Sequence, residues 1–354
     1  MKPPILSRAL LSAALLSCGL LTTGCHAESK TQTEASTAAA GAPASGWKVT
    51  LQSTAWKATG FEGNMDLSGI AAVDAVHCLL GSDELLGVQP GLLDRGSMTI
   101  KALPVIPLVA NPSGAKGEVD IEGVAVAPAD HCYYVTGSHG VGKKKGEYHA
   151  TRASVFKLPC DPKTGEITGK GIQHASLMPW LEQSPEFQAF AKQPLQRNGF
   201  NIEGLTFKDG RLWFGVRGPN VDGHTFVIEV EPDSLFGGGL PACKVHTLPV
   251  GQGRGIRELA AVREGFVVLT GNASAEASKK FPVSVSRMPD ASFDLFLWRP
   301  GKTPETQSIG QLPSPSAKAE ALLVLEDSEK YVDLLVLFDG APDGAPRSYR
   351  LTRP

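Results

Sequence analysis

The chain has 354 residues, with 34 Lys and Arg against 36 Asp and Glu, and a formal net charge of −2 at pH 7. Charges this evenly balanced give no electrostatic reason to expect binding to nucleic acid or to an anionic membrane surface. The 39 Gly and 26 Pro, with little helical periodicity, are typical of a turn-rich, all-β chain. We therefore expect a local site, rather than a charged surface, to define the function.

Residues 1–25 are predicted to be a signal peptide of the lipoprotein type. The apolar run over residues 9–21 is too short to span a bilayer. It ends at Gly24-Cys25, which resembles the bacterial lipoprotein box, and this predicts lipidation of Cys25. Lipidation of Cys18 and cleavage as an ordinary secreted protein are the alternatives.

The next segment, residues 26–46, is rich in Ala, Ser, Thr and Gly and is expected to be a flexible linker. Residues 47–354 are then long enough to form one closed domain. Together with the lipidation of Cys25, this predicts a monomer anchored by lipid to the periplasmic face of the outer membrane. A soluble periplasmic or secreted protein is the alternative.

A short phrase recurs five times in residues 47–354. Each copy contains a Ser or Glu next to a small or apolar residue and begins an apolar strand. A turn and a second apolar strand follow each copy. The copies begin at Leu67, Ile121, Ile202, Arg257 and Ala319. A repeat of this kind predicts a β-propeller with one four-stranded blade per copy. We expect five blades, with six as the alternative.

Two segments outside the repeats complete this prediction. The last copy is followed by too few residues for a full blade, and residues 47–52 alternate apolar and polar side chains. We expect this N-terminal strand to close the ring. The longest interval between copies contains Ser184-Pro185-Glu186 with Phe187 and Phe190, which predicts a short helical insertion near residues 180–193.

The first strand of each propeller blade lines the central channel, so residues at one repeat position form a ring. The predicted ring is Ser68, Glu122, Glu203, Glu258 and Glu320. Four carboxylates in one channel raise one another's pKa unless a cation compensates them. Calcium, which takes six to eight oxygen ligands, suits this set better than magnesium. The alternative is that the Glu side chains accept hydrogen bonds between blades without metal.

The sequence around two of these residues resembles known propeller families. Asp120-Ile121-Glu122-Gly123 and Asn201-Ile202-Glu203-Gly204 resemble an uncharacterised bacterial propeller family, a domain of unknown function, and are similar to phytase-like and esterase-like propellers. The ring positions also resemble those of calcium-dependent apyrases. That resemblance implies a calcium ion in the channel, and it departs at Glu258, where the apyrases have a hydroxyl group.

The ends of the second strands are expected to return to the mouth of the channel, near the start of the ring. These ends contain Asp83, His139, Arg217, Asn272 and Asp339. We expect Arg217, His139, Asn272 and Asp339 to bind substrate, within a basic collar that also includes residues 143–145 and Arg254. This arrangement predicts a small anionic ligand or an envelope protein as partner.

Two functions of different classes fit these residues. The first, which we favour because no nucleophile is identifiable, is a binding platform with calcium in its channel. The alternative is a calcium-assisted hydrolase of phosphate or carboxylic esters, in which Arg217 holds the anion and His139 or Asp83 acts as acid or base.

Residues 137–143 match a phosphate-binding loop only in part, because Lys144 replaces the Ser or Thr that this loop requires.

Four cysteines lie in the predicted propeller and could form disulfides in an oxidising compartment. They are Cys78, Cys132, Cys160 and Cys243. The pairing 78–132 with 160–243 is one of three possible connectivities, and free buried thiols are the alternative. None of the four has the spacing of a zinc site.

Overall fold

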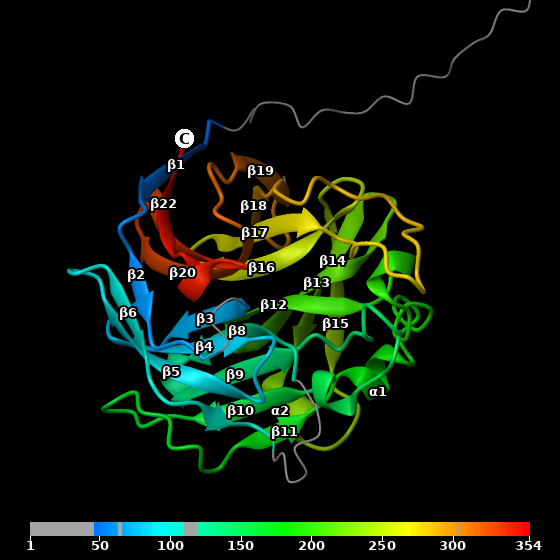
Figure 1. Ribbon diagram of the computed structural model, residues 1–354, viewed down its shortest axis with the longest axis horizontal. Coiled ribbons are helices and arrows are strands. Elements are labelled where there is room, and N and C mark those ends of the chain that lie inside the picture. Colours follow the sequence, from blue (N-terminus) through cyan, green and yellow to red (C-terminus); the bar gives the residue numbers. More distant parts are fainter. Residues whose placement is uncertain (1–45, 63–65, 110–118, 304) are drawn as a thin grey trace, which may run out of the picture. The chain divides into compact units, whose positions relative to one another are not determined.

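The computed structural model describes residues 46–62, 66–109, 119–303 and 305–354. The predicted signal peptide with Cys18 and Cys25, and almost all of the predicted linker, lie outside these residues. The described residues form five sheets, antiparallel except for one short strand of blade 1, and each sheet is a blade of a propeller (Figure 1). This confirms the predicted all-β, five-bladed fold.

Blades 1 and 2 come first in the chain after the closing strand β1. Blade 1 contains β3 (Leu67–Ala72), β4 (His77–Ser82), β5 (Gly87–Asp94) and β6 (Thr99–Ala102), with β2 (Lys57–Thr59) parallel to β6 and β7 (Ile106–Pro107) beside β5. Blade 2 contains β8 (Ile121–Ala127), β9 (Cys132–Gly137), β10 (Val155–Pro159) and β11 (Gln173–Ala175).

Blades 3 and 4 each contain four consecutive strands. Blade 3 contains β12 (Asn201–Lys208), β13 (Arg211–Val221), β14 (His224–Val230) and β15 (Cys243–Pro249). Blade 4 contains β16 (Arg254–Val262), β17 (Gly265–Asn272), β18 (Asp294–Trp298) and β19 (Thr306–Gln311). The long connection between β17 and β18, residues 273–293, contributes to the cavity described below.

Blade 5 joins the two ends of the domain. It contains β20 (Lys318–Asp327), β21 (Tyr331–Asp339), β22 (Arg347–Thr352) and the N-terminal strand β1 (Lys48–Ser53). Strand β1 pairs with β22 from Lys48 opposite Thr352 onward. The expected closure of the ring by the N-terminal strand is therefore confirmed.

The inner strands of the blades contact one another in the order β3, β8, β12, β16, β20 and back to β3. One apolar core fills each of the five junctions between neighbouring blades. Because both faces of a blade are covered in this way, the inner strands consist almost entirely of buried residues. This explains why the sequence shows short apolar runs there rather than strict alternation.

The expected helical insertion is present between blades 2 and 3. Helix α1 covers Met178–Leu181, and hydrogen-bonded turns continue from there through residue 193. Phe187 is completely buried and packs edge-on against Phe200 and Phe226. The longest interval between repeats therefore holds this insertion, and the alternative of a sixth blade is wrong.

The remaining helices are short and lie in connections between strands. They are α2 (Pro232–Phe236) and the 3-10 turns η1 (Pro128–Asp130), η2 (Ala150–Arg152), η3 (Leu195–Arg197) and η4 (Pro342–Gly344). No helix in the described ranges is long and apolar enough to cross a membrane. The four propeller cysteines are free thiols, so neither disulfide of the considered pairing forms in this structure.

Candidate functional site

A β-bulge interrupts each inner strand close to its first residue. At every bulge, one residue of the inner strand has no partner in the second strand of the blade. In blade 3, for example, Ile202 pairs with Val216 and Gly204 pairs with Gly215, so Glu203 between them is unpaired. The unpaired residues are Ser68, Glu122, Glu203, Arg257 and Glu320. Bulges re-aim side chains, and here they define the ring at the channel.

In blade 4, the ring residue differs by one position from the residue predicted from the sequence. Ile256 occupies the position of Ile121 and Ile202, so Arg257, and not Glu258, is the ring residue of this blade. The conserved element of the phrase is thus an apolar residue before the ring residue. Aligning Ile256 with the other two isoleucines would have identified Arg257 from the sequence.

Glu258 instead occupies the small-residue position that Gly204 has in blade 3. There a Cβ on Gly204 would lie 2.6 Å from Cδ2 of Leu259, because the neighbouring inner strand packs closely. Glu258 is 1% exposed, and its Oε1 accepts hydrogen bonds from the backbone N–H of Leu205 at 3.0 Å and of Leu259 at 2.8 Å. Burial raises its pKa well above the ordinary value. Glu258 therefore joins blades 3 and 4 and does not face the channel.

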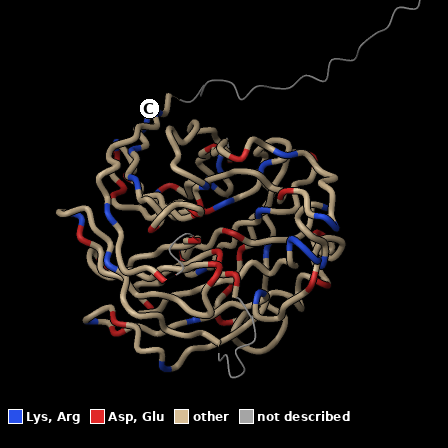
Figure 2. Tube along the Cα trace, viewed as in Figure 1, with Lys and Arg blue, Asp and Glu red and all other residues tan. Residues whose placement is uncertain are grey.

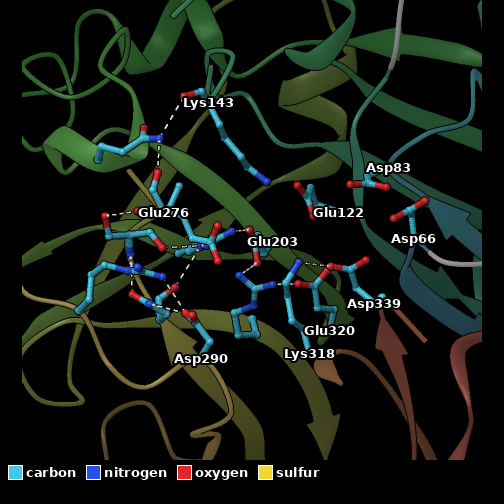
Figure 3. Close-up of a pocket in the computed structure, with 18 of the residues that line it drawn as sticks. Asp66, Asp83, Glu122, Lys143, Glu203, Glu276, Asp290, Lys318, Glu320 and Asp339 are labelled. Atoms are coloured by element: carbon cyan, nitrogen blue, oxygen red, sulfur yellow. Dashed lines mark hydrogen bonds and ion pairs between the residues drawn. The ribbon is translucent and has the colours of Figure 1, made fainter. Parts of the chain in front are cut away.

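A cavity of 470 Å³ lies at the mouth of the channel (Figure 3). Three ring carboxylates, Arg257 and several loop residues line it. Its acidic residues are Asp66, Asp83, Glu122, Glu203, Glu276, Asp290, Glu320 and Asp339, and its basic residues are Lys143, Lys144, Arg217, Arg257, Arg287 and Lys318. Figure 2 shows Asp and Glu gathered where the inner strands come together. Neither Ser68 nor Glu258 lines this cavity.

Arg257 compensates two of the three ring carboxylates. Its Nη1 lies 2.7 Å from Oε2 of Glu203, and its Nη2 pairs with Glu320. Arg217 contributes a second cation, with Nη1 2.5 Å from Oε1 of Glu203. Burial by itself would raise the pKa of Glu203, but the two guanidinium groups outweigh burial and hold the pKa below its ordinary value. Glu203 is thus ionised and paired with two arginines.

This network bears on the calcium expected from the sequence. Of the five predicted ligands, Ser68 and Glu258 do not line the cavity, and Glu203 and Glu320 are paired with arginine. Across the described part of the chain, no three His, Cys, Asp or Glu side chains are grouped so that they could hold a metal ion. The five predicted residues do not fit a calcium ion, and the arginines supply the positive charge that the sequence argument assigned to it.

His139 does not reach the cavity, contrary to its predicted role in binding or catalysis. Its side chain is completely buried. Nδ1–H donates to the carbonyl of Gly137 at 3.0 Å, and Nε2 accepts from the N–H of Leu177 at 3.2 Å. Burial lowers its pKa to about 4, so the ring is neutral near pH 7. His139 holds the start of the insertion against blade 2.

Arg217, Asn272 and Asp339 line the cavity as expected, but each is engaged by neighbouring groups. Arg217 donates from Nε to the carbonyl of Asn272 and from Nη2 to that of Ser274, both at 3.0 Å. Asn272 donates to Asp290 at 2.9 Å, and Asp339 pairs with Lys318 at 2.7 Å. Arg217 therefore has a structural role in addition to lining the cavity.

The predicted basic collar is only partly present. Lys143 and Lys144 line the cavity, whereas Lys145 and Arg254 do not. Arg254 instead pairs through Nε with Asp294 at 2.7 Å. Figure 3 shows the Lys143 side chain directed toward Glu122. The mouth is thus not uniformly basic.

Four carboxyl groups form what we call the acidic corner of the cavity: Asp66, Asp83, Glu122 and Asp339. The sequence analysis missed Asp66, which directly precedes the first repeat phrase, as Asp120 precedes the second. Burial, with the negative charge of Asp120, raises the pKa of Asp83 to about 7, although Lys143 acts in the opposite direction. Burial likewise raises the pKa of Asp66, with Asp339 adding to the effect.

Glu122 is the most deeply buried member of the acidic corner, with 3% of its surface exposed. Burial and the charge of Glu203 raise its pKa well above the ordinary value. Within the part of the chain that the structure describes, no side chain or backbone group donates a hydrogen bond to it, and no cation lies within ion-pair distance. Glu122 is therefore the ring carboxylate that has no ion pair with an arginine, although Arg257 acts on it at longer range.

Replacing Arg257 tests the network. Arg257→Gln leaves Glu203 and Glu320 without their shared cation, and we expect the free energy of unfolding to fall by about 3–5 kcal/mol. Arg287→Gln is the control, because the pair of Arg287 with Asp290 is partly exposed and is expected to contribute at most about 1 kcal/mol. The measurement is denaturant unfolding of both variants and the parent. Equal small losses in the two variants would contradict a central role for Arg257.

Glu258→Gln tests the burial of an acid between blades 3 and 4. The raised pKa means that the folded chain holds the proton more tightly than the unfolded chain, whose value is near 4.5. The contribution of Glu258 to stability is thus fully present below 4.5 and is lost as pH rises toward the folded pKa. Gln keeps the acceptor oxygen and cannot ionise, so we expect its stability relative to the parent to increase with pH. Unfolding measured between about pH 5 and about pH 8 shows this. A difference that does not change with pH, as expected for the exposed control Glu329→Gln, would contradict it.

Comparisons with known proteins place the chain in a family without showing an activity. A search of curated proteins finds no match. Among solved structures, an exo-beta-1,3-galactanase from Phanerochaete chrysosporium is 11% identical, with a TM-score of 0.45 over 86% of this chain and 64% of that chain. A virginiamycin B lyase from Staphylococcus aureus is 11% identical, with a TM-score of 0.38 over 87% of this chain and 100% of that chain. A protein from Lactobacillus plantarum is 15% identical, with a TM-score of 0.35 over 78% of this chain and 69% of that chain.

Similarities this low carry no argument about function. The family match is of a different kind, since it extends over nearly the whole propeller. The chain belongs to the family described as "Protein of unknown function (DUF3616)", whose model matches residues 66–159 and 161–351.

Proposed function

We propose that this protein is a cell-envelope propeller that binds a small molecule in the cavity at the mouth of its channel. The observation that carries the proposal is Glu122, a carboxylate 3% exposed that lines a cavity of 470 Å³. In the same cavity, Oδ1 of Asp83 is buried without a hydrogen-bond partner in the described residues, which is costly, and a ligand with donors would remove that cost. The cavity volume lies within the range of small-molecule sites, about 300–1,000 Å³.

The location of the protein in this proposal rests on the sequence. The apolar run, the Gly24-Cys25 box and the polar linker support export and lipidation of Cys25. The anchor would leave the propeller free on the periplasmic side of the outer membrane. Calcium in the ring is not part of the proposal, because the ring carboxylates other than Glu122 are compensated by arginine.

One observation favours hydrolysis as a second candidate function. Asp83 lines the cavity, and burial raises its pKa to about 7. A carboxyl group with this pKa can act as general acid or base near neutral pH. Lys143 and Lys144 border the same cavity and could orient the anionic part of a phosphate or carboxylic ester. His139 and Arg217 have no part in this reaction, since both are held by the surrounding structure.

The binding proposal is tested by blocking the cavity. Ala277 is exposed and lines the cavity, so Ala277→Trp should fill part of it without disturbing a core. Ala242→Trp adds the same group at an exposed position away from the cavity and is the control. We expect ligands that raise the melting temperature of the parent and of Ala242→Trp to lose that effect in Ala277→Trp. A broad panel of amines, sugars, esters and phosphate compounds supplies the ligands.

Mass spectrometry of the same mixtures separates the two functions. Recovery of every ligand unchanged supports a binding platform. Product formation that disappears in Asp83→Asn supports the hydrolase. If no compound shifts the melting temperature and none is converted, or if the Trp at position 277 has no effect on binding, the mouth is not the site.

Lipid anchoring is tested by Cys25→Ala in a bacterial host. We expect the variant to leave the membrane fraction or to accumulate unprocessed, because the lipid is attached to the Cys sulfur. Cys18→Ala is the matched control and should fractionate like the parent. A Cys25→Ala variant that stays processed and membrane-bound would contradict the assignment, and release by Cys18→Ala would transfer it to Cys18.

A further inference from the structure

Some of the charged side chains that line the mouth cavity form ion pairs with one another, and others do not. Arg217 and Arg257 pair with the ring, Arg287 with Asp290, and Lys318 with Asp339. Among the described residues no such pair involves Asp66, Asp83 or Glu122, which lie on the same side of the cavity (Figure 3). The acidic corner is therefore the part of the cavity where negative charge is least compensated.

Glu122 adds an observation that is independent of this clustering. It belongs to β8 and sits at a bulge, whereas Asp66 and Asp83 flank β3 and β4 of the neighbouring blade. The residue is 3% exposed, and its carboxylate lines the cavity without a hydrogen-bond donor among the described residues. A buried carboxylate of this kind requires either a proton or a donor from outside the protein.

The spacing of the carboxyl groups selects the kind of cation. Calcium needs its oxygen ligands within about 2.3–2.6 Å of one point. The described acidic side chains do not form such a group of three. An ammonium group has three donors and contacts oxygens at about 2.7–2.9 Å in separate directions, so it can bridge carboxylates that do not converge. Lys143 already directs a group of this chemistry toward Glu122 (Figure 3).

The lining of the cavity also includes apolar side chains. Phe293 is 3% exposed and Ala275 is 7% exposed, and both line the cavity together with Ala277. These side chains can contact the carbon skeleton of a ligand whose charged end lies among the carboxylates. The anionic ligand expected from the sequence depended on His139 and Arg217, neither of which is available.

We propose that the ligand of the mouth cavity is a small organic amine, whose primary ammonium group is held by Asp66, Asp83, Glu122 and Asp339 while its carbon skeleton contacts Phe293 and Ala275. This inference rests on the proposed binding function and specifies its ligand class.

Binding of the amine requires ionised carboxylates. The charged groups that act on Asp83 and Glu122 are the acids Asp66, Asp120, Glu203 and Asp339 and the cations Lys143, Arg152 and Arg257. Near pH 7, binding should therefore release protons and strengthen as pH rises.

The test is isothermal titration of the full chain with matched probes. n-Butylamine is compared with n-butanol, and glucosamine with glucose, while calcium chloride is titrated separately. We expect each amine to bind at least about tenfold more tightly than its uncharged counterpart, a difference of about 1.4 kcal/mol. Titration in buffers of different ionisation enthalpy should show proton release for the amines.

Variants connect the binding to the acidic corner. Glu122→Gln and Asp83→Asn keep the shape of the side chain and should each weaken amine binding about tenfold or more, whereas the exposed control Glu329→Gln should not change it. Lys143→Ala removes the neighbouring protein cation and should strengthen amine binding. This last variant keeps the test valid if a corner variant fails to fold.

The outcomes separate this inference from the proposed function. If amines bind no better than their uncharged counterparts while another compound of the panel binds at the mouth, the proposed function stands and the amine inference is overturned. Calcium binding that Glu122→Gln abolishes would also overturn it, in favour of a metal site. If Lys143→Ala destabilises the protein and leaves amine binding unchanged or weaker, Lys143 itself is the partner of the corner, and the inference fails.

Discussion

The arginine at the ring of blade 4 is the interaction on which the centre of this propeller depends. A bulge in each inner strand aims one residue at the channel, and three of the five residues are glutamates. Three buried carboxylates at such short range could not remain ionised together without compensation. Arg257 comes from the same ring position in the fourth copy and contacts two of them, so one copy of this structural element balances two others.

Close packing of the inner strands explains the rest of the phrase. Directly after the ring residue, three blades have glycine, because the next inner strand passes too near for a side chain there. Blade 4 has Glu258 at this position, and its carboxyl group is used as an acceptor for two backbone N–H groups. Blade 4 therefore has Arg257-Glu258 where blades 2 and 3 have Glu-Gly. Arg257 brings a positive charge to the ring, and Glu258 occupies the glycine position as a hydrogen-bonded acid. Because the cores lie between blades, each of these substitutions affects two blades at once.

Much of this architecture could be predicted from the sequence. The recurrence of one phrase gave the number of blades, and the shortage of strands at the C-terminus together with the alternating residues 47–52 indicated how the ring closes. Both predictions depend on counting and periodicity, which are properties of the sequence itself. The insertion was also recognisable, since Phe187 and Phe190 have no place in a blade.

The site was predicted less well, because its residues depend on one-residue register and on burial. Only blade 4 has a glutamate one residue after the ring position, and choosing that glutamate placed Glu258 in the ring instead of Arg257. His139 and Arg217 were expected at the mouth as free polar groups at strand ends. Whether such a group is free is decided by segments distant in sequence: the N–H of Leu177 for His139 and the carbonyl of Ser274 for Arg217.

The balance of charge along the channel has a consequence for where chemistry can occur. At the ring, guanidinium groups already occupy Glu203 and Glu320, and opening those pairs to admit a ligand would expose buried charges. In the acidic corner the protein has left Asp66, Asp83 and Glu122 without such partners, and their raised pKa values record that imbalance. An approaching cation lowers the energy of the corner but gains nothing from the ring. The arginine pairs of the ring therefore hold the blades together, and under the proposal made above a cationic ligand would bind at the carboxyl groups of the corner, which lack such pairs.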